Sequence, residues 1–168
     1  PRYILIAGSD IMRKNIKNVS SLIDRYGYYA YLIRLNKSIK CNCMNPVTKD
    51  ADCKCKKCLG TGYKIHISKV FLASREVNEQ ESNKIQGFSA TPKIMYMKGY
   101  VEVHKDDIIV DTENAFTVLE TQHHRGTSGY QAFTRCVCPD MKLNKSLFIK
   151  LFKEVLNDYL SKHDNNKQ

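Results

Sequence analysis

The sequence contains no tryptophan and has fewer acidic than basic residues, 17 against 27, which gives a formal charge of +10. It also lacks any run close to the ~20 consecutive apolar residues that cross a bilayer as a helix, so we expect no membrane partner. A secretory signal is not visible, because the chain opens on Pro1-Arg2-Tyr3 without a long apolar stretch. This pattern favours a reducing compartment, where disulfides are rare.

Signatures of common enzyme classes are missing as well. The sequence has no phosphate-binding P-loop, no His-Glu-x-x-His, no Gly-x-Ser-x-Gly and no Rossmann glycine set. The pair Asp106-Asp107 is more typical of a turn than of a catalytic dyad. We therefore expect no enzymatic activity.

What is present is an ordinary globular composition, with 42% hydrophobic and 26% charged residues. A length of 168 residues suits one domain with one core, so we expect 1–168 to form a single domain. The charge of +10 favours phosphate backbones or an acidic protein as a partner, and it does not decide between them.

The most informative pattern is a cluster of cysteines between residues 41 and 58. Two close pairs, Cys41-x-Cys43 and Cys55-x-x-Cys58, flank a short loop, and such pairs can build a tetrahedral thiolate cage for zinc. Cys53 lies beside the second pair and could replace Cys55 or Cys58. We favour the set with Cys58, because Cys-x-x-Cys followed by glycine is the stronger knuckle signal. Two disulfides, or reduced thiols without metal, are the alternatives.

A site filled by four thiolates leaves no position for water, so we expect a structural zinc in an inserted knuckle at 41–62. Lysines crowd this segment, namely Lys40, Lys49, Lys54, Lys56, Lys57 and Lys64. They could offset the charge of about −2 on a divalent ion held by four thiolates, or they could form a basic finger that grips phosphate. We therefore take Lys54, Lys56 and Lys57 as candidate contacts to a partner or to DNA.

Apolar periodicity predicts a mainly β fold between two helices. A stripe from Met12 to Ile23 predicts a helix over roughly residues 10–26, which Gly27 can end. A wide apolar face predicts a second helix over about residues 144–161. Alternating or branched runs predict strands at 28–35, 63–73, 94–103, 108–110, 116–120 and 130–138. We therefore expect an α+β, mainly β fold, with a small antiparallel β-barrel or sandwich, an N-terminal helix, a C-terminal helix and the inserted zinc finger loop.

Two loops contain further candidate contacts. Residues 76–92 are polar and show no periodicity, which is long for a connection in a compact domain. Phe88 in this loop either anchors a partner or folds back onto the core.

A hairpin tip is expected at residues 123–129, where His123, His124 and Arg125 are candidate contacts. A solvated tip is the plainer interpretation of these three residues, because no carboxylate or nucleophile stands beside them in the sequence. In the strand that follows, Cys136 and Cys138 share one face. Core packing is the favoured interpretation of these two thiols, and a disulfide or a second metal half-site is the alternative.

The order of these elements resembles a known family. A helix ending in Arg25-Tyr26-Gly27 is followed by a strand, a Cys-x-Cys, a polar loop and the knuckle Cys55-Lys56-Lys57-Cys58-Leu59-Gly60-Thr61-Gly62-Tyr63. The segments that complete the pattern are Asp107–Val110, Phe116–Leu119 and Gln131–Cys138. This layout resembles the head-to-tail connector, or head-completion, proteins in the neck of tailed bacteriophages. Many of those proteins carry a knuckle of this form in a small β-barrel.

The resemblance covers residues 10–140 in layout, and its specific motif spans 41–63. Zinc modules of some chaperones share the Cys-x-x-Cys-x-Gly-x-Gly part. This sequence departs from the family pattern in the extra Cys53, in the long loop at 76–92 and in the length of the C-terminal helix.

The resemblance implies a structural virion protein. Its subunits would form a ring that joins the DNA-filled head to the tail and helps retain the DNA until ejection. The implied partners are further copies of the chain, a portal or adaptor protein, tail terminator or tail proteins, and double-stranded DNA bound without sequence preference. The implied location is the neck of the virion, after assembly in the host bacterial cytoplasm.

Two other functions are compatible with the residues. A zinc-ribbon protein that binds nucleic acid or regulates it would explain both the knuckle and the charge. An enzyme with a reactive thiol outside the metal site would have only Cys53, Cys136 and Cys138 available.

Overall fold

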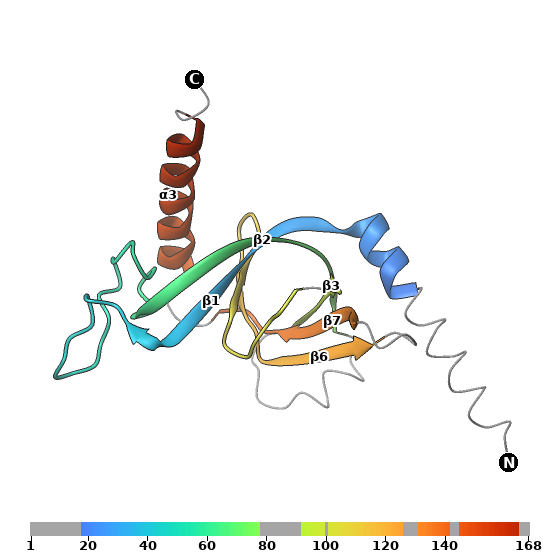
Figure 1. Cartoon of the computed structure of the whole chain (residues 1–168), viewed down its shortest axis with the longest axis horizontal. Coiled ribbons are helices and arrows are strands. Elements are labelled where there is room, and N and C mark those ends of the chain that lie inside the picture. Colours follow the sequence, from blue (N-terminus) through green and yellow to red (C-terminus); the bar gives the residue numbers. More distant parts are fainter. Residues whose placement is uncertain (1–17, 78–91, 100, 126–130, 142–144, 165–168) are drawn as a thin grey trace, which may run out of the picture.

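The computed structural model describes residues 18–77, 92–99, 101–125, 131–141 and 145–164 (Figure 1). Within these residues the chain is mainly β, with one helix before the sheet and one after it, which confirms the predicted fold class. The first helix includes residues 18–26 of the predicted 10–26, and residues 10–17 lie outside the described residues. The remaining elements are β1 (Tyr28–Lys40), β2 (Tyr63–Glu76), β3 (Lys93–Lys98), β4 (Ile108–Val110), β5 (Ala115–Thr117), β6 (Glu120–Arg125), β7 (Gln131–Cys138) and α3 (Lys145–Asp164).

The seven strands form one sheet in the order β5-β4-β1-β2-β3-β7-β6, and every paired strand is antiparallel to its neighbour. The sheet curls into a half-barrel, which is visible around the centre of Figure 1. Its two ends are joined between β5 and β6. Val118 N–H donates to Asp107 O at 2.8 Å on the β4 side, and Leu119 N–H donates to Val137 O at 2.9 Å on the β7 side. The backbone between β5 and β6 therefore links both ends of the sheet.

The concave side of the sheet encloses the main core. Alternate residues of a strand face the same side, so β1, β2, β3 and β7 each contribute two side chains to it. Cys136 and Cys138 are both fully buried in this core and behave as small apolar residues, as the sequence indicated. The buried members are Ala30, Leu32, Val70, Leu72, Met95, Met97, Val103, Ile109, Phe116, Val118, Cys136 and Cys138.

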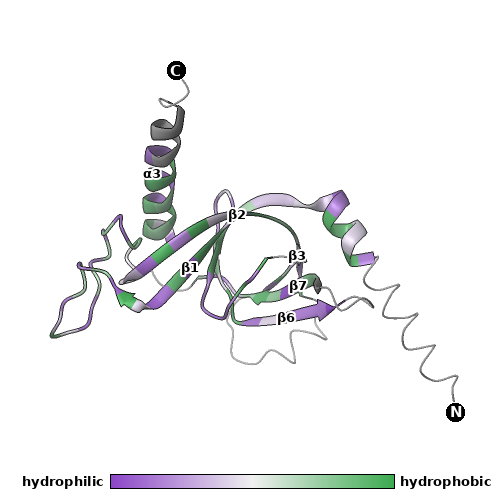
Figure 2. Cartoon of the chain, in the orientation of Figure 1, coloured by the Kyte–Doolittle hydropathy of each residue, from purple (hydrophilic) through white to green (hydrophobic). Residues whose placement is uncertain are grey.

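The convex side is covered at two places by the helices. Phe148, Leu151 and Phe152 of α3 pack against Ile33 and Val110 of β1 and β4. Ile23 of the first helix packs in a separate cluster with residues of β2, β3 and β7. Figure 2 shows this distribution, with hydrophobic residues along α3 and the central strands and mostly hydrophilic residues along β6.

The first helix ends where the sequence predicted. Gly27 N–H donates to Ile23 O at 2.9 Å and closes the last turn. A Cβ at Gly27 would lie 2.4 Å from the Phe71 ring. The absence of a side chain at Gly27 therefore lets the helix end pack directly on β2.

Several strands differ in length from the prediction. β2 continues to Glu76 instead of residue 73, and the strand expected at 116–120 is divided between β5, which ends at Thr117, and β6, which begins at Glu120. β1 continues to Lys40 instead of stopping at residue 35, because Asn36 pairs with Lys64 and Lys40 pairs with Tyr63 of β2. β3 ends at Lys98, and residues 101–104 are not a strand, although residues 94–103 were predicted as one. Gly99 sits in a turn, which ends the pairing with β7.

The predicted hairpin tip at 123–129 is also wrong in part. His123, His124 and Arg125 belong to β6, where they pair with β7. The polar character of the segment suggested a loop, but one face of β6 is open to solvent, and such a strand tolerates polar side chains. Residues 126–130, most of residues 76–92 and Phe88 lie outside the described residues.

Candidate metal centre

The β1–β2 hairpin extends beyond the barrel and carries the cysteines at its end. From Asn36 to Lys40 every residue of β1 is exposed, so this part of the strand packs against no core. We call residues 36–64 the finger arm. In Figure 1 the arm projects from the same end of the sheet at which α3 stands.

The finger arm brings four of its five cysteines together. Cys41 Sγ lies 3.8 Å from Cys55 Sγ, and Cys43 Sγ lies 3.4 Å from Cys58 Sγ. All four sulfur atoms lie within 4.8 Å of one another. These are the four residues that the spacing predicted, and the four could bind a metal ion.

The sulfur positions fit a tetrahedral ion. Four sulfurs at ~2.3 Å from zinc are separated from one another by roughly 3.8 Å. The two closest contacts, 3.8 and 3.4 Å, are near that value. All seven cysteines of the chain lie in the described residues and are free, so the thiols are available as ligands.

Cys53, the predicted substitute ligand, lies outside this group. Its side chain is exposed, whereas its backbone packs beneath the knuckle. A Cβ at Gly60 would lie 2.9 Å from Cys53 O. Cys53 therefore supports the turn through its backbone, and its thiol faces solvent.

The knuckle after Cys55 depends on left-handed backbone. Leu59, Gly60 and Gly62 have φ of 53°, 76° and 79°, a region that glycine adopts without steric cost. Gly60 N–H donates to Cys55 O at 3.2 Å, and Gly62 N–H donates to Cys58 Sγ at 3.4 Å. The second of these bonds orients the sulfur of Cys58, one of the four clustered thiols.

The loop between the cysteine pairs contains hydrogen bonds of its own. Met44 and Ala51 form an antiparallel bridge. Beyond the bridge, Asn45 Oδ1 accepts from Val47 N–H at 2.8 Å and from Thr48 N–H at 3.3 Å. These two hydrogen bonds order the tip of the loop, where the Val47 side chain is 85% exposed.

The thiols differ in how readily they lose a proton. A hydrogen bond from the backbone of Cys43 lowers the pKa of Cys41 to about 7, while burial raises the pKa of Cys43 to about 12. Burial also raises the pKa of Cys58, and the Gly62 N–H opposes that rise. Because metals bind the thiolate, a metal ion held by these cysteines would displace protons and would be bound more weakly as the pH falls.

The knuckle is fastened to α3. Leu59 is 2% exposed and belongs to the cluster of Phe148, Leu151 and Phe152. Beside it, Lys56 Nζ lies 2.9 Å from Glu154 Oε2 of α3. Lys56, predicted as an external contact, is therefore paired within the chain. The sequence signal for this attachment was a single leucine inside a polar segment.

The predicted contacts on β6 are not part of the metal centre. His123 Nδ1 lies 3.2 Å from Thr134 Oγ1 on β7. The His124 ring stacks on Phe133, with centroids 4.4 Å apart. Burial lowers the pKa of His124, and the charges of Arg135 and His123 lower it further. Arg125 is exposed at the end of the strand.

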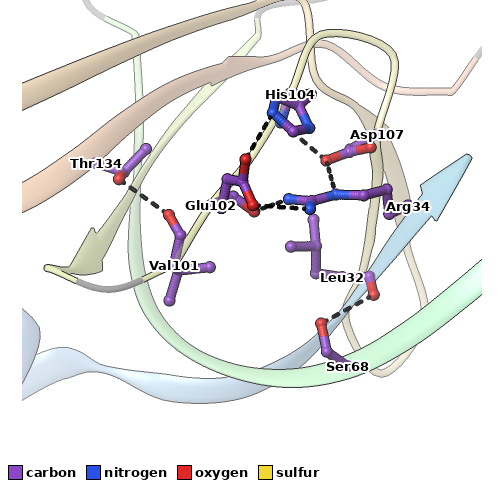
Figure 3. A network of polar contacts seen from close by, with 8 residues as sticks. All are labelled: Leu32, Arg34, Ser68, Val101, Glu102, His104, Asp107 and Thr134. Atoms are coloured by element: carbon purple, nitrogen blue, oxygen red, sulfur yellow. Dashed lines mark hydrogen bonds and ion pairs between the residues drawn. The ribbon is translucent and has the colours of Figure 1, made fainter.

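A separate polar network holds the segment between β3 and β4 (Figure 3). Arg34 Nη1 lies 3.1 Å from Glu102 Oε2, and Arg34 Nε lies 3.5 Å from Asp107 Oδ2. Asp107 is buried and also accepts from His104 N–H at 2.8 Å. Arg34 thus fastens residues 101–107 to β1.

A cavity of ≈ 300 Å³ lies beside this network, and Arg34, His66, Ser68 and Glu102 are among its lining residues. The guanidinium that lines it is already engaged by Glu102 and Asp107. Arg34 and Glu102 therefore serve the fold, and sequence reasoning did not identify them.

Neither a protein-family model nor a curated protein matches the sequence. Among the described residues, no helix combines the length and apolar character needed to cross a bilayer.

Proposed function

We propose that this protein is a structural component of the neck of a tailed bacteriophage. Its subunits form a ring that joins the portal side of the DNA-filled head to the tail and helps retain the DNA until ejection. One observation carries the proposal. A four-cysteine knuckle extends from one hairpin of a small curled antiparallel sheet that also carries a helix before it and a helix after it.

The proposed ion is zinc in a structural role. A cage of four cysteine sulfurs leaves no open coordination position for water or substrate, so zinc held there shapes the chain without performing chemistry. Zinc would bind through Cys41, Cys43, Cys55 and Cys58 and fix the knuckle relative to α3. The proposal therefore includes no enzymatic activity.

Ring formation requires different surfaces of one subunit to meet its two neighbours, with a rotation that closes. The proposed ring contacts a portal or adaptor protein on one side and tail terminator or tail proteins on the other. Its net charge of +10 per subunit suits non-specific contact with double-stranded DNA in the channel.

The second candidate is a zinc-ribbon protein that binds nucleic acid or regulates it. The lysines of the finger arm favour this function, because Lys40, Lys49, Lys54, Lys57 and Lys64 are all exposed. This candidate needs no ring.

Native mass spectrometry of the purified protein separates the two candidates, with the metal read from the same spectrum. The neck function predicts one zinc per chain and a ring that forms when a portal-type protein is added. A zinc-bearing monomer or dimer that ignores the portal protein but binds an oligonucleotide tightly would favour the second candidate. A chain without metal would contradict both.

A further inference from the structure

The finger arm has an unusual charge distribution. Five of its lysines are exposed and have no ion-pair partner among the described residues, namely Lys40, Lys49, Lys54, Lys57 and Lys64. By contrast, Lys37 and Lys56 are paired with Asp106 and Glu154. The two acidic residues of the arm are Asp50 and Asp52, and the side chain of Asp52 accepts from Lys54 N–H at 2.9 Å. Much of the positive charge of the arm therefore remains unneutralised.

The type of basic residue indicates the kind of partner. The finger arm contains seven lysines and no arginine, and its one aromatic residue is Tyr63 at the base. Protein interfaces are enriched in arginine and aromatic residues and depleted of lysine. Bases are read most often by the planar fork of arginine. Lysine acts as a point charge, which suits a uniform phosphate backbone better than an acidic protein surface.

The arm holds these charges in a defined place. The paired strands at its base, the bridge between Met44 and Ala51, and the packing of Leu59 against α3 all restrict its motion. A pre-ordered basic surface loses less conformational entropy on binding than a flexible basic tail would. Val47, exposed at the tip, adds no charge that would oppose phosphate.

We propose that the finger arm is a binding surface for the phosphate backbone of double-stranded DNA, without sequence preference. Lys54 and Lys57, which directly precede Cys55 and Cys58, contribute two of the contacts. This inference deepens the proposed function, on which it rests for the presence of a duplex partner. It assigns that partner to one surface of the chain.

Charge balance at the cysteine site is the competing explanation for the same lysines. Ammonium groups near four thiolates and a divalent ion would offset a net charge of about −2. Under that explanation, removal of Lys54 and Lys57 would weaken metal retention and leave DNA binding unchanged. Under the proposal, removal of the same lysines would weaken DNA binding and leave metal retention unchanged.

The test measures fluorescence anisotropy of the full-length, zinc-loaded protein with a labelled duplex of about 30 base pairs, in two unrelated sequences, between about 50 and 200 mM salt. The variant is Lys54→Gln with Lys57→Gln. Its matched control is Arg25→Gln with Lys105→Gln, which removes two exposed charges outside the arm. Zinc content and melting temperature are recorded for each protein.

We expect the arm variant to lose about tenfold or more in affinity at the lower salt for both duplexes. The slope of log K against log salt should be shallower by roughly 1.8 in this variant, because each of the two lost phosphate contacts contributes ~0.9 to the slope. The control should change little, and all three proteins should keep one zinc per chain.

Equal losses in both double variants would overturn the proposal, because net charge alone would then explain binding. Loss of zinc without loss of DNA affinity would overturn it in favour of charge balance. Tight binding of poly-glutamate with no duplex binding would overturn it in favour of an acidic protein. Assembly with a portal-type protein is measured separately by native mass spectrometry. A ring that still forms would show that the neck function holds even if DNA binding by the arm is overturned.

Discussion

At the scale of single residues, Leu59 decides how the metal site is attached to the rest of the chain. It is the one buried apolar side chain of residues 41–62 apart from Cys58, and it enters the α3 cluster. Leu59→Ala should lower the free energy of unfolding by about 2–5 kcal/mol, from lost apolar contacts and a cavity. Urea denaturation measures the change.

The matched variant is Lys56→Gln, which removes the exposed ion pair with Glu154 and leaves Leu59 in place. We expect little change from it, because exposed pairs contribute little to stability. Comparable losses in the two variants would mean that charge, and not packing, fastens the arm to α3.

Arg34 supports a second prediction at this scale. Arg34→Ala leaves the Asp107 carboxylate buried and without its cation. We expect a loss of about 1–3 kcal/mol in the free energy of unfolding, because the buried carboxylate would keep the His104 N–H but lose its only nearby cation among the described residues. Adding Asp107→Asn should restore part of the loss, since it removes the uncompensated charge. A simple sum of the two single losses would show that the two side chains do not interact.

His124 predicts a dependence of stability on pH. Burial lowers its pKa in the fold, while an unfolded histidine titrates near ~6.5. The contribution of neutral His124 to the free energy of unfolding is therefore fully present above the unfolded pKa. It is lost as the pH falls through the folded pKa, because the unfolded chain takes up the proton more readily.

Urea midpoints at about pH 7.5 and about pH 5.5 test this contribution. His124→Phe keeps a ring against Phe133 and should reduce the drop between the two pH values. His66→Gln, at an exposed position, should leave the wild-type drop unchanged. A drop of wild-type size in His124→Phe would assign the acid sensitivity to other groups.

At the scale of elements, the finger arm should depend on its metal. Residues 41–62 contribute little to the core besides Cys58 and Leu59, so metal binding has to order most of the segment. We expect a chelator, or Cys55→Ser with Cys58→Ser, to remove amide protection from the arm while β2, β3 and β7 keep theirs.

Hydrogen exchange followed by mass spectrometry reports both regions in one experiment. Cys53→Ser is the control, because Cys53 lies outside the four-cysteine group and should retain zinc. Full protection of the arm in the metal-free protein would show that its hydrogen bonds suffice without the ion.

Elements with a local cause were predicted well from the sequence. The knuckle, the position of Gly27 and the short strand at 108–110 follow from residues adjacent in the chain, and the structure contains all three. The length of β1 was not predictable, because its polar end is held by β2 and not by its own composition. For the same reason the polar residues His123 and His124 were mistaken for a loop.

At the scale of the whole molecule, the cysteine cluster could be predicted from the sequence and its surroundings could not. Cys41, Cys43, Cys55 and Cys58 are close in sequence, so spacing favours this set, although it left Cys53 as a possible substitute that the structure places outside the group. The contact of the knuckle with α3 joins segments nearly a hundred residues apart, roughly from 59 to 152, and no local pattern encodes it. The Arg34–Asp107 pair escaped prediction for the same reason.

The proposed ring leads to a prediction for the assembled particle. Cys55→Ser with Cys58→Ser should fold its barrel, yet dock poorly on the neighbouring ring, because the arm would no longer hold a defined shape. Native mass spectrometry with a portal-type protein measures assembly. Normal assembly of this metal-free variant would show that the arm does not contribute to the interface with the neighbouring ring.

The pairing of β1 with β4 has a consequence for how quickly the chain reaches this structure. Tyr31 pairs with Val110, and the finger arm, β2 and β3 all lie between them in the sequence. Closing so large a loop lowers the entropy of the chain before stabilising contacts have formed. Proteins with such pairings therefore refold slowly. The hairpins β1–β2 and β6–β7 should form early, and the step that unites β4 with β1 should limit the refolding rate. Substitutions at Ile109, which sits in that pairing, would then slow refolding more than substitutions in the first helix.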